Sequence, residues 1–576
     1  MKKLKKMAST LVFLLSLYKK YALGFLIVTV VFWAFWGPAN SLLNVYTSSV
    51  ILDQIVKQSP YAAILLTAAG FAAAQFLLTA ATQLMEQLYM RVKQTHISFK
   101  INREIFDKAI ATDYKYYDSP EFFADFTWAA QNLDGQLEQA RSILENLIQN
   151  FTQFIAMTAY ILMVGPWVLL VSAANLILSA ALQFRINKLW VKQSEENLQY
   201  QRRQQYFHRM FYTVEPAADM KATRIRNFFF RKYDKVTEDG VGVVKKYGWK
   251  ITFNSLLQNA VSRAAFFANV ALIVYSVIGG EIANVARYSA LLAASQQLQN
   301  AMINLTWQFA NLDRVVQYME KVRKFFDIKS EIEISDGAGG KEPDGGAGGI
   351  EMRGVKFAYG LEVRDDSRFV LNGLDMQIKP GEKIAIVGEN GVGKSTLMKL
   401  LLRLYDVSGG EIRVNGVPLA DYDVRKLRDR IGVAFQNSTV YALPLAENLR
   451  VYRDADEEQL RGILKRVGLS KLLDNEGGID AELTREFDDN GVMLSGGEMQ
   501  KFALARLLTG GFGLLLLDEP TASLDPLAEY ELNKMILDRN RPETIIVIAH
   551  RLSTVRDADR IYLIDNGAVA EAGSHE

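Results

Sequence analysis

The sequence predicts a chain of two parts, an α-helical membrane domain with six transmembrane helices followed by a soluble α/β domain. Long apolar stretches are confined to the part before about residue 310, and a Gly-rich stretch covers 329–349. Short apolar runs that alternate with helical patterns fill the remainder. A chain of 576 residues is also too long for one hydrophobic core. We therefore expect a membrane domain at 1–328, a linker at 329–349 and a soluble domain at 350–576.

Composition excludes several classes of function. The formal net charge of +2 gives no reason to expect a nucleic-acid partner, because acids balance Lys and Arg across the chain. The chain has no cysteine and only four histidines. Disulfides and thiolate metal sites are therefore excluded, and neither a histidine-based metal centre nor redox chemistry is expected.

The N-terminal segment is basic and then apolar. A secretory signal is one interpretation of this pattern. However, no small-residue cleavage site follows the apolar run at 11–18, and Lys19 and Lys20 interrupt it before a longer apolar stretch begins. A short interfacial helix on the cytoplasmic face fits better.

Six stretches are apolar and long enough to cross a bilayer, which takes about 20 residues. The two long polar segments between them, at 89–140 and 188–250, are rich in Lys and Arg, so the positive-inside rule places them in the cytoplasm. Their helical periodicity predicts extensions of the spanning helices beyond the bilayer. Gly165 and Pro166 form the tight turn between the third and fourth spans. The predicted spans are 21–50, 61–88, 141–164, 166–187, 255–279 and 285–309.

Both cytoplasmic segments have an aromatic tip, at 118–126 and 217–230. Each tip resembles a short cross-helix, and exposed aromatic residues at a loop tip favour docking onto another domain. Packing within their own loops is the alternative. In the sixth span, Gln296, Asn300 and Asn304 recur every four residues and share one helical face. This face should line a wet cavity or pair with another helix, and the sequence leaves both open.

The Gly-rich and charged stretch 329–349 has no apolar period and is predicted to be a flexible connector. The soluble domain then contains a phosphate-binding pattern. Residues 384–387 (IAIV) form a buried strand, 388–396 (GENGVGKST) a glycine loop and 397–404 an apolar helix. Its backbone N–H groups and helix N-terminus suit phosphate oxygens. The predicted binding residues are Gly388, Glu389, Asn390, Gly391, Val392, Gly393, Lys394, Ser395 and Thr396, with the Ser395 hydroxyl available for Mg²⁺.

A second apolar strand, 514–517 (LLLL), ends at Asp518 and Glu519. We expect Asp518 to hold Mg²⁺, directly or through water, and Glu519 to polarise the attacking water. A strand-end Asp-Glu pair could also be a solvated turn. Its combination with the phosphate loop favours the catalytic interpretation.

The soluble domain resembles ABC (ATP-binding cassette) proteins. The stretch 494–498 (LSGGE) is similar to the family signature, and the other motifs follow in the expected order. The resemblance implies that Gln436 is the Q-loop glutamine, a catalytic and metal-contacting residue, and that His550 is the switch histidine. It implies that Tyr359 stacks on adenine and that 523–525 (SLD), with Asp525, is the D-loop. The six-span half looks like the arrangement of multidrug and peptide exporters.

The resemblance also implies a dimer. In the family, two cassettes pair head to tail, so ATP on one phosphate loop is contacted by Ser495, Gly496 and Gly497 of the other cassette. One chain has one cassette, so a second half-transporter chain is required. A homodimer is favoured, and a heterodimer is the alternative.

The chain departs from the family pattern at several positions. Glu498 stands where glutamine is most frequent, which bears on ribose contact or local charge. Arg485, Phe487 and Asp489 depart from the commonest form of the segment before the signature. The sequence also stops at Glu576, where the family usually continues with a short helix, so a truncated end is expected.

The predicted function is ATP-driven export of a peptide or amphipathic small molecule by alternating access, with ATP and Mg²⁺ as cofactors. A membrane-embedded sensor or regulator that hydrolyses ATP without moving a substrate is the alternative from another class. An importer is disfavoured because membrane and ATPase parts are fused in one chain. We expect a multi-pass protein of the bacterial inner membrane, with termini and ATPase domain in the cytoplasm.

Overall fold

The computed structural model describes residues 2–164, 166–213, 216–278, 285–332, 341–343, 348–360 and 369–575. The chain divides into two compact units. The helical unit comprises Met1–Phe106 and Phe126–Phe326, and the α/β unit comprises Asp107–Asp125 and Asp327–Glu576. Three predicted features lie wholly or partly outside the described residues: Gly165 of the tight turn, 333–340 and 344–347 of the linker, and Glu576 at the end.

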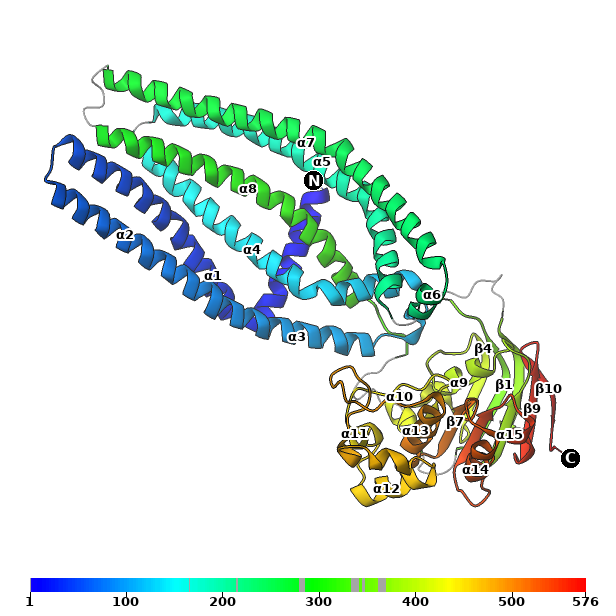
Figure 1. Cartoon of the computed structure of the whole chain (residues 1–576). Helices are drawn as coiled ribbons and strands as arrows, with labels where there is room; N and C mark the ends of the chain where they lie inside the picture. Colours follow the sequence, from blue (N-terminus) through cyan, green and yellow to red (C-terminus); the bar gives the residue numbers. More distant parts are fainter. Residues whose placement is uncertain are drawn as a thin grey trace. The chain divides into compact units, whose positions relative to one another are not determined.

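The helical unit consists of long helices, several of which are far longer than a bilayer requires (Figure 1). A π-helical stretch, Leu84–Met90, joins the second helix to the third. The short α6 lies between α5 and α7, within the second predicted cytoplasmic segment, 188–250. The helices are α1 (Lys2–Val56), α2 (Tyr61–Gln83), α3 (Arg91–Ile110), α4 (Pro120–Val164), α5 (Trp167–Tyr212), α6 (Ala217–Ala222), α7 (Ile225–Ile278) and α8 (Val285–Phe326).

Four stretches in the described residues are long and apolar enough to cross a membrane: Tyr18–Val56, Tyr61–Ile110, Gly135–Val164 and Val168–Tyr212. They contain the first three predicted spans and all but residues 166 and 167 of the fourth. The fifth and sixth predicted spans lie along α7 and α8, although neither helix is among these four. Helix α1 is kinked at Ala22, where the backbone leaves helical geometry (φ −158°, ψ 53°). The kink falls at the junction between the predicted interfacial segment and the first span.

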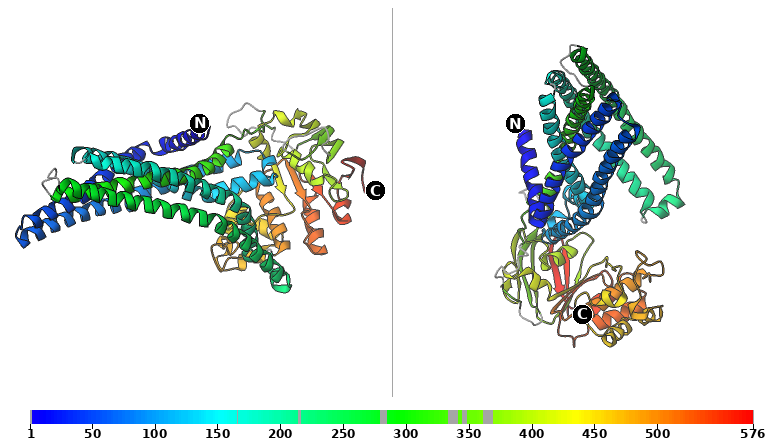
Figure 2. Two further views of the ribbon diagram at one scale, coloured as in Figure 1. Left: turned by 90° about the horizontal axis from the view of Figure 1, so that it is seen from above. Right: turned by 90° about the vertical axis from the view of Figure 1, so that its left-hand side faces the viewer.

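Helix pairs α5 and α7, and α1 and α8, lie against each other in the helical unit (Figure 2). Buried apolar residues from α1, α4, α5 and α8 form one core cluster that includes Val45, Met157, Ile161, Val168 and Leu298. These helices therefore meet through apolar packing, with polar contacts added at defined places.

Amides join the helices across this core. Asn304 donates to Asn150 on α4 (3.2 Å), Gln153 to Gln297 (2.9 Å), and Asn269 to Ser295 (2.9 Å). At the same time, the predicted stripe of Gln296, Asn300 and Asn304 is exposed on α8. Both interpretations of this stripe thus have support, because Asn304 bonds another helix while the stripe remains open on one side.

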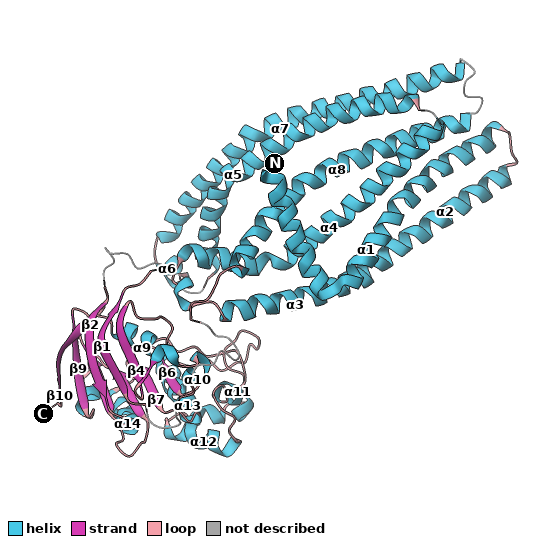
Figure 3. Ribbon diagram, turned by 180° about the vertical axis from the view of Figure 1, so that it is seen from behind, coloured by secondary structure: helices cyan, strands magenta, loops and turns pink. Residues whose placement is uncertain are grey.

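The α/β unit contains two sheets (Figure 3). The antiparallel sheet has the order β2-β1-β4-β5 and the larger sheet the order β10-β9-β3-β8-β7-β6. In the larger sheet, β3, β6, β7, β8 and β9 pair in parallel and β10 is antiparallel. The strands are β1 (Ile350–Phe357), β2 (Leu371–Ile378), β3 (Lys383–Val387), β4 (Gly409–Val414), β5 (Val417–Pro418), β6 (Ile431–Ala434), β7 (Leu514–Asp518), β8 (Thr544–Ile548), β9 (Arg560–Asp565) and β10 (Ala568–Gly573).

Apolar strands hold the unit together. Strands β7 and β8 are buried at every residue, as expected for parallel strands covered on both faces. One core cluster includes residues of both sheets, and a second packs the helices on the larger sheet. The helices are α9 (Lys394–Leu401), α10 (Val424–Arg428), α11 (Leu445–Leu449), α12 (Glu457–Arg466), α13 (Gly496–Thr509), α14 (Pro526–Ile536) and α15 (Leu552–Arg556).

Candidate nucleotide-binding site

The predicted strand, loop and helix are present as β3, residues 388–393 and α9. Two glycines of the loop are required by close approach. A Cβ on Gly388 would lie 2.3 Å from the carbonyl oxygen of Ile564, and one on Gly393 would lie 2.6 Å from the Leu371 side chain. Both also have positive φ angles, 152° and 104°, which favour glycine. The backbone can therefore turn tightly at both positions, where no other residue type fits.

Lys394 begins α9 and folds back over the loop. Its Nζ donates to the carbonyl oxygens of Gly388 and Glu389, both at 2.8 Å. Burial lowers the pKa of Lys394, while the carboxylates of Glu519 and Asp518 act in the opposite direction. The ammonium thus lies inside the loop, where the phosphates of a nucleotide are expected.

Asp518 and Glu519 follow β7, next to the phosphate loop. Asp518 is buried and accepts a hydrogen bond from the Ser395 hydroxyl, and burial raises its pKa. A carboxylate, a hydroxyl and phosphate oxygens are the ligands that Mg²⁺ prefers. No cluster of three or more His, Asp or Glu that could hold a metal occurs in the described residues. The Ser395 and Asp518 pair therefore fits Mg²⁺ completed by a nucleotide, and does not indicate a protein-only metal centre.

Two residues from separate loops, Gln436 and His550, meet at Glu519. Gln436 Nε2 donates to Glu519 Oε2 at 3.1 Å, and His550 Nε2 lies 3.0 Å from Glu519 Oε1. Glu519 has a positive φ of 49°, which is strained for a residue with a side chain. The three predicted catalytic residues are thus brought together, with one neighbour for each carboxylate oxygen.

Tyr359 lies beside the first turn of α9, the helix that follows the phosphate loop. Its hydroxyl is 2.9 Å from Thr396 Oγ1, its ring is partly exposed, and Tyr405 packs edge-on against it with centroids 5.5 Å apart. Lys399 Nζ lies 5.4 Å from the Tyr359 ring centroid. Tyr359 is therefore a partly exposed aromatic residue beside the phosphate loop, and its stacking on adenine stays a prediction.

The signature residues lie at the start of α13. Ser495 caps the helix and Glu498 completes a capping box. Gly497 faces the D-loop segment, since a Cβ there would lie 3.2 Å from Leu524 and from the carbonyl oxygen of Ser523. Asp525 caps α14 by accepting from the backbone N–H groups of Leu527 and Ala528 at 3.1 and 3.0 Å. The signature and the D-loop are therefore neighbours in one chain.

Arg506 is a residue that the motif analysis missed. It is buried on α13 and donates from Nε to the Asn448 carbonyl oxygen at 2.9 Å, and it also bonds the Thr439 carbonyl and the Asn448 side chain. Asn448 in turn bonds the backbone of Tyr441 and Leu443. The signature helix is thereby joined to the segment that follows Gln436. The signal available in the sequence was an arginine among the apolar residues of the helix that follows the signature.

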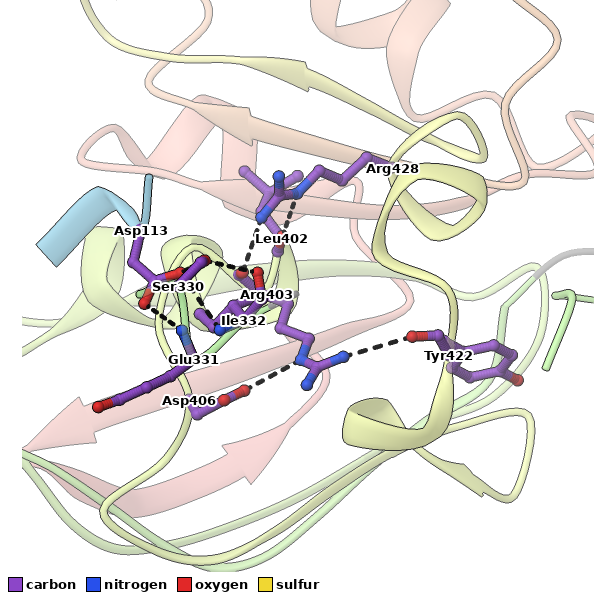
Figure 4. Close-up of polar contacts among 9 residues, drawn as sticks. All are labelled: Asp113, Ser330, Glu331, Ile332, Leu402, Arg403, Asp406, Tyr422 and Arg428. Carbon is purple, nitrogen blue, oxygen red and sulfur yellow. Dashed lines mark hydrogen bonds and ion pairs between the residues drawn. The ribbon is translucent and has the colours of Figure 1, made fainter. Parts of the chain in front are cut away.

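Asp113 was missed as well. This buried carboxylate accepts from the backbone N–H groups of Glu331 and Ile332 at 2.8 and 3.2 Å and from the Ser330 hydroxyl (Figure 4). Lys115 adds an ion pair with Glu331 at 2.5 Å. The loop between α3 and α4 is therefore fastened to the start of the predicted linker.

The tip of that loop also contacts residues near the nucleotide site. Tyr114 packs edge-on against Tyr405 with centroids 5.7 Å apart, and the Tyr405 hydroxyl bonds Asp118. Arg428 holds the chain near Tyr405, because it donates to the carbonyl oxygens of Leu402 and Arg403 at 2.9 and 2.8 Å (Figure 4). Asp118, the first residue of the predicted tip 118–126, thus contacts the α/β unit, whereas the side chains of 120–125 lie outside the described residues and docking of the aromatic tip stays a prediction.

The second tip behaves differently in the described residues. Phe230 stacks on Phe211 with centroids 4.7 Å apart, and Phe229 contacts Phe207 at 6.0 Å. These are contacts within its own loop, although Phe228 and Phe230 remain about half exposed. The interpretation of packing within the loop therefore holds for part of this tip, and its exposed aromatic surface is open to a partner.

The fold and this site define an ATP-binding α/β domain joined to a multi-pass helical membrane domain. Residues 371–522 match the family model described as ABC transporter. The α/β unit is therefore an ATP-binding domain of the ABC transporter type.

Similar proteins point the same way. The chain is 36% identical over 251 residues to the uncharacterised ABC transporter ATP-binding protein YwjA of Bacillus subtilis (strain 168), covering 43% of this chain and 42% of that protein. It is 35% identical over 270 residues to the glutathione/L-cysteine transport system ATP-binding/permease protein CydC of Haemophilus influenzae, covering 46% and 45%. It is 34% identical over 264 residues to an ATP-dependent lipid A-core flippase of Paraburkholderia xenovorans, covering 46% and 43%. The matches thus span less than half the length of these relatives.

One solved structure resembles the whole chain. The structure of a bacterial Atm1-family ABC exporter with ATP bound aligns with a TM-score of 0.78 at 20% identity, over 95% of each chain. At 20% identity, this similarity shows that the two chains share a fold. Together with the family match, it supports an exporter-type ABC half-transporter fold, with the helical domain first and the ATPase domain second.

Proposed function

We propose that the protein is an ATP-driven exporter that works as a dimer by alternating access. The observation that carries this proposal is Glu519, which lies beside the phosphate loop with Gln436 at one carboxylate oxygen and His550 at the other. Such an arrangement suits a base that orients an attacking water. The helical domain of the same chain is the part that ATP hydrolysis would move.

The proposed roles combine the geometry of the site with the resemblance to ABC proteins. Residues 388–396 bind the phosphates, Tyr359 stacks on adenine, and Ser395, Asp518 and Gln436 hold Mg²⁺. Bound Mg²⁺ would neutralise charge on the phosphates. Glu519 polarises the water, and His550 keeps the carboxylate oriented. Ser495, Gly496, Gly497 and Glu498, with Asp525 in the D-loop, complete the site of a second chain.

A second half-transporter chain is therefore part of the proposal, and a homodimer is favoured because every expected catalytic residue is present. We also propose that the chain lies in the bacterial inner membrane with its ATPase domain in the cytoplasm. We propose a peptide or amphipathic small molecule as substrate. The polar exposed face of α8 supports an amide-binding cavity, and similar proteins are named for lipid A-core, multidrug and glutathione or cysteine transport.

The decisive experiment uses the full chain in lipid nanodiscs, with its mass determined there. We expect a dimer that hydrolyses ATP, and we expect Glu519→Gln to lower the rate at least about a hundredfold while ATP still binds. Accumulation of a fluorescent peptide or amphipathic dye in inside-out vesicles, dependent on ATP and lost in Glu519→Gln, would establish export. ATP hydrolysis that no compound stimulates and that moves none would instead favour the sensor or regulator. A pure monomer without activity would contradict the homodimer.

A further inference from the structure

The serine of the signature already uses its hydrogen bonds within its own helix. Ser495 Oγ donates to Glu498 Oε2 at 2.7 Å, and the backbone N–H of Ser495 donates to the same carboxylate oxygen at 2.8 Å. The backbone N–H of Glu498 donates back to Ser495 Oγ at 3.3 Å. A hydroxyl has one proton to give. This proton therefore cannot bind a phosphate oxygen until the contact with Glu498 is broken.

The Glu498 carboxylate also occupies a favourable position for an anion. It lies at the N-terminus of α13, where the helix dipole attracts negative charge. The backbone N–H and the hydroxyl of Ser495 lower the pKa of Glu498, and Lys501 and Lys471 add to this effect. The carboxylate is therefore negative at neutral pH and occupies both donors of Ser495, its hydroxyl and its backbone N–H.

We propose that the Glu498 carboxylate is a built-in competitor of ATP at the signature, holding in the open dimer the donors that the γ-phosphate takes on closure. This inference rests on the proposed dimeric function. When ATP on the partner's phosphate loop approaches, the Ser495 hydroxyl must turn away from Glu498, and two anions then share one helix terminus. Closure of the two ATPase domains consequently needs more ATP than it would with an uncharged residue at position 498.

Glutamine is the informative replacement. Its amide oxygen can accept from the Ser495 backbone N–H, so Glu498→Gln keeps the capping box while it removes the charge. The absence of cysteine from the chain makes a single spin label straightforward. Leu527, which is 68% exposed at the start of α14, is a suitable position for Leu527→Cys. A homodimer then carries two labels.

The experiment measures the distance between the two labels by double electron–electron resonance, in nanodiscs, as ATP is titrated. The Glu519→Gln background prevents turnover, so the readout is closure and not activity. We expect Glu498→Gln to lower the ATP concentration for half-maximal closure about fivefold, because a charge at a helix terminus has an effect of this order. Glu458→Gln, which removes an exposed carboxylate from the first turn of α12, is the matched control and should leave the midpoint unchanged.

The outcomes separate this inference from the proposed function. If Glu498→Gln unfolds at the same temperature as the parent but its ATP midpoint for closure is unchanged or higher, Glu498 does not compete with ATP and the inference is refuted. If the chain binds ATP but no distance between two labels is detected in any variant, the proposed homodimer is refuted, and this inference with it. A midpoint that falls in Glu458→Gln as much as in Glu498→Gln would assign the effect to net charge and would also overturn the inference.

Discussion

Gln436 and Glu519 are 83 residues apart in the sequence, yet Gln436 Nε2 donates to Glu519 Oε2 at 3.1 Å. The hydrogen bond joins the loop after β6 to the loop after β7. These strands are parallel neighbours, so their carboxyl ends lie at the same edge of the sheet. The expected base is therefore positioned by sheet topology as well as by its own sequence motif.

His550 should act by orienting Glu519. Because it lies 3.0 Å from Glu519 Oε1, His550→Ala is expected to lower the ATPase rate about tenfold to a hundredfold while ATP affinity stays within about twofold. Steady-state hydrolysis and binding of a fluorescent ATP analogue measure the two effects. Ser553→Ala, three residues further on, is the control. A loss of ATP binding in His550→Ala would show that the histidine acts on the nucleotide and not on Glu519.

Asp518 should reduce the stability of the nucleotide-free protein. Burial raises the pKa of Asp518, so the charged carboxylate is disfavoured in the folded state. The destabilisation by Asp518 therefore grows as the pH rises from the ordinary pKa of an aspartate towards the raised pKa of Asp518. Asp518→Asn is expected to raise the melting temperature by about 2–4 °C at pH 8 and by less at pH 5. Thermal scanning without nucleotide measures this.

Asp525→Asn provides a control of opposite sign. The backbone N–H groups of Ala528 and Leu527 hold the pKa of Asp525 below its ordinary value, so its charge favours the folded state at neutral pH. We expect no gain in melting temperature from this variant. A gain of equal size in both variants would contradict the explanation by burial and would indicate a general effect of lower negative charge.

Asp113 should protect the segment that follows α8 from proteolysis. Its carboxylate accepts three hydrogen bonds from residues 330–332, so Asp113→Ala removes all three acceptor contacts. Trypsin should then cleave after Lys329 about tenfold faster, because hydrogen bonds to a charged group contribute about 1.5–3 kcal/mol. Asp107→Ala, which changes an exposed aspartate in the last turns of α3, is the control. Equal cleavage rates in the two variants would contradict the fastening role of Asp113.

Arg506 should be intolerant of lysine. Its guanidinium makes bonds to Thr439 and Asn448 that diverge from one planar group, and a lysine ammonium cannot reproduce this geometry. Arg506→Lys is expected to destabilise the ATPase domain by about 2–3 kcal/mol, since buried carbonyl and amide groups lose their partners. Chemical denaturation followed by circular dichroism measures this, because all seven tryptophans of the chain lie before residue 310. The control is Arg466→Lys at the exposed end of α12, and a similar loss there would refute the argument from burial.

Local motifs were predictable from the sequence. The phosphate loop, the signature at 494–498 and the strand that ends at Asp518 are each defined by neighbours within a few residues. In such motifs backbone geometry follows from residue type, as with the positive φ angles of Gly388 and Gly393. The pattern of serine followed three residues later by glutamate also indicates the contact between Ser495 and Glu498.

Contacts between distant segments were decided by the tertiary structure alone. Asp113 and Glu331 are 218 residues apart, and Arg506 and Asn448 are 58 apart. No periodicity in the sequence identifies such pairs, because a hydrogen bond depends on where separate elements bring a donor and an acceptor. By itself the sequence determined the two-part fold class and the motif residues. Only the packing of strands and helices decided which oxygen of Glu519 meets Gln436, which buried donors hold Asp113, and how the amides of α8 divide between helix contact and open surface.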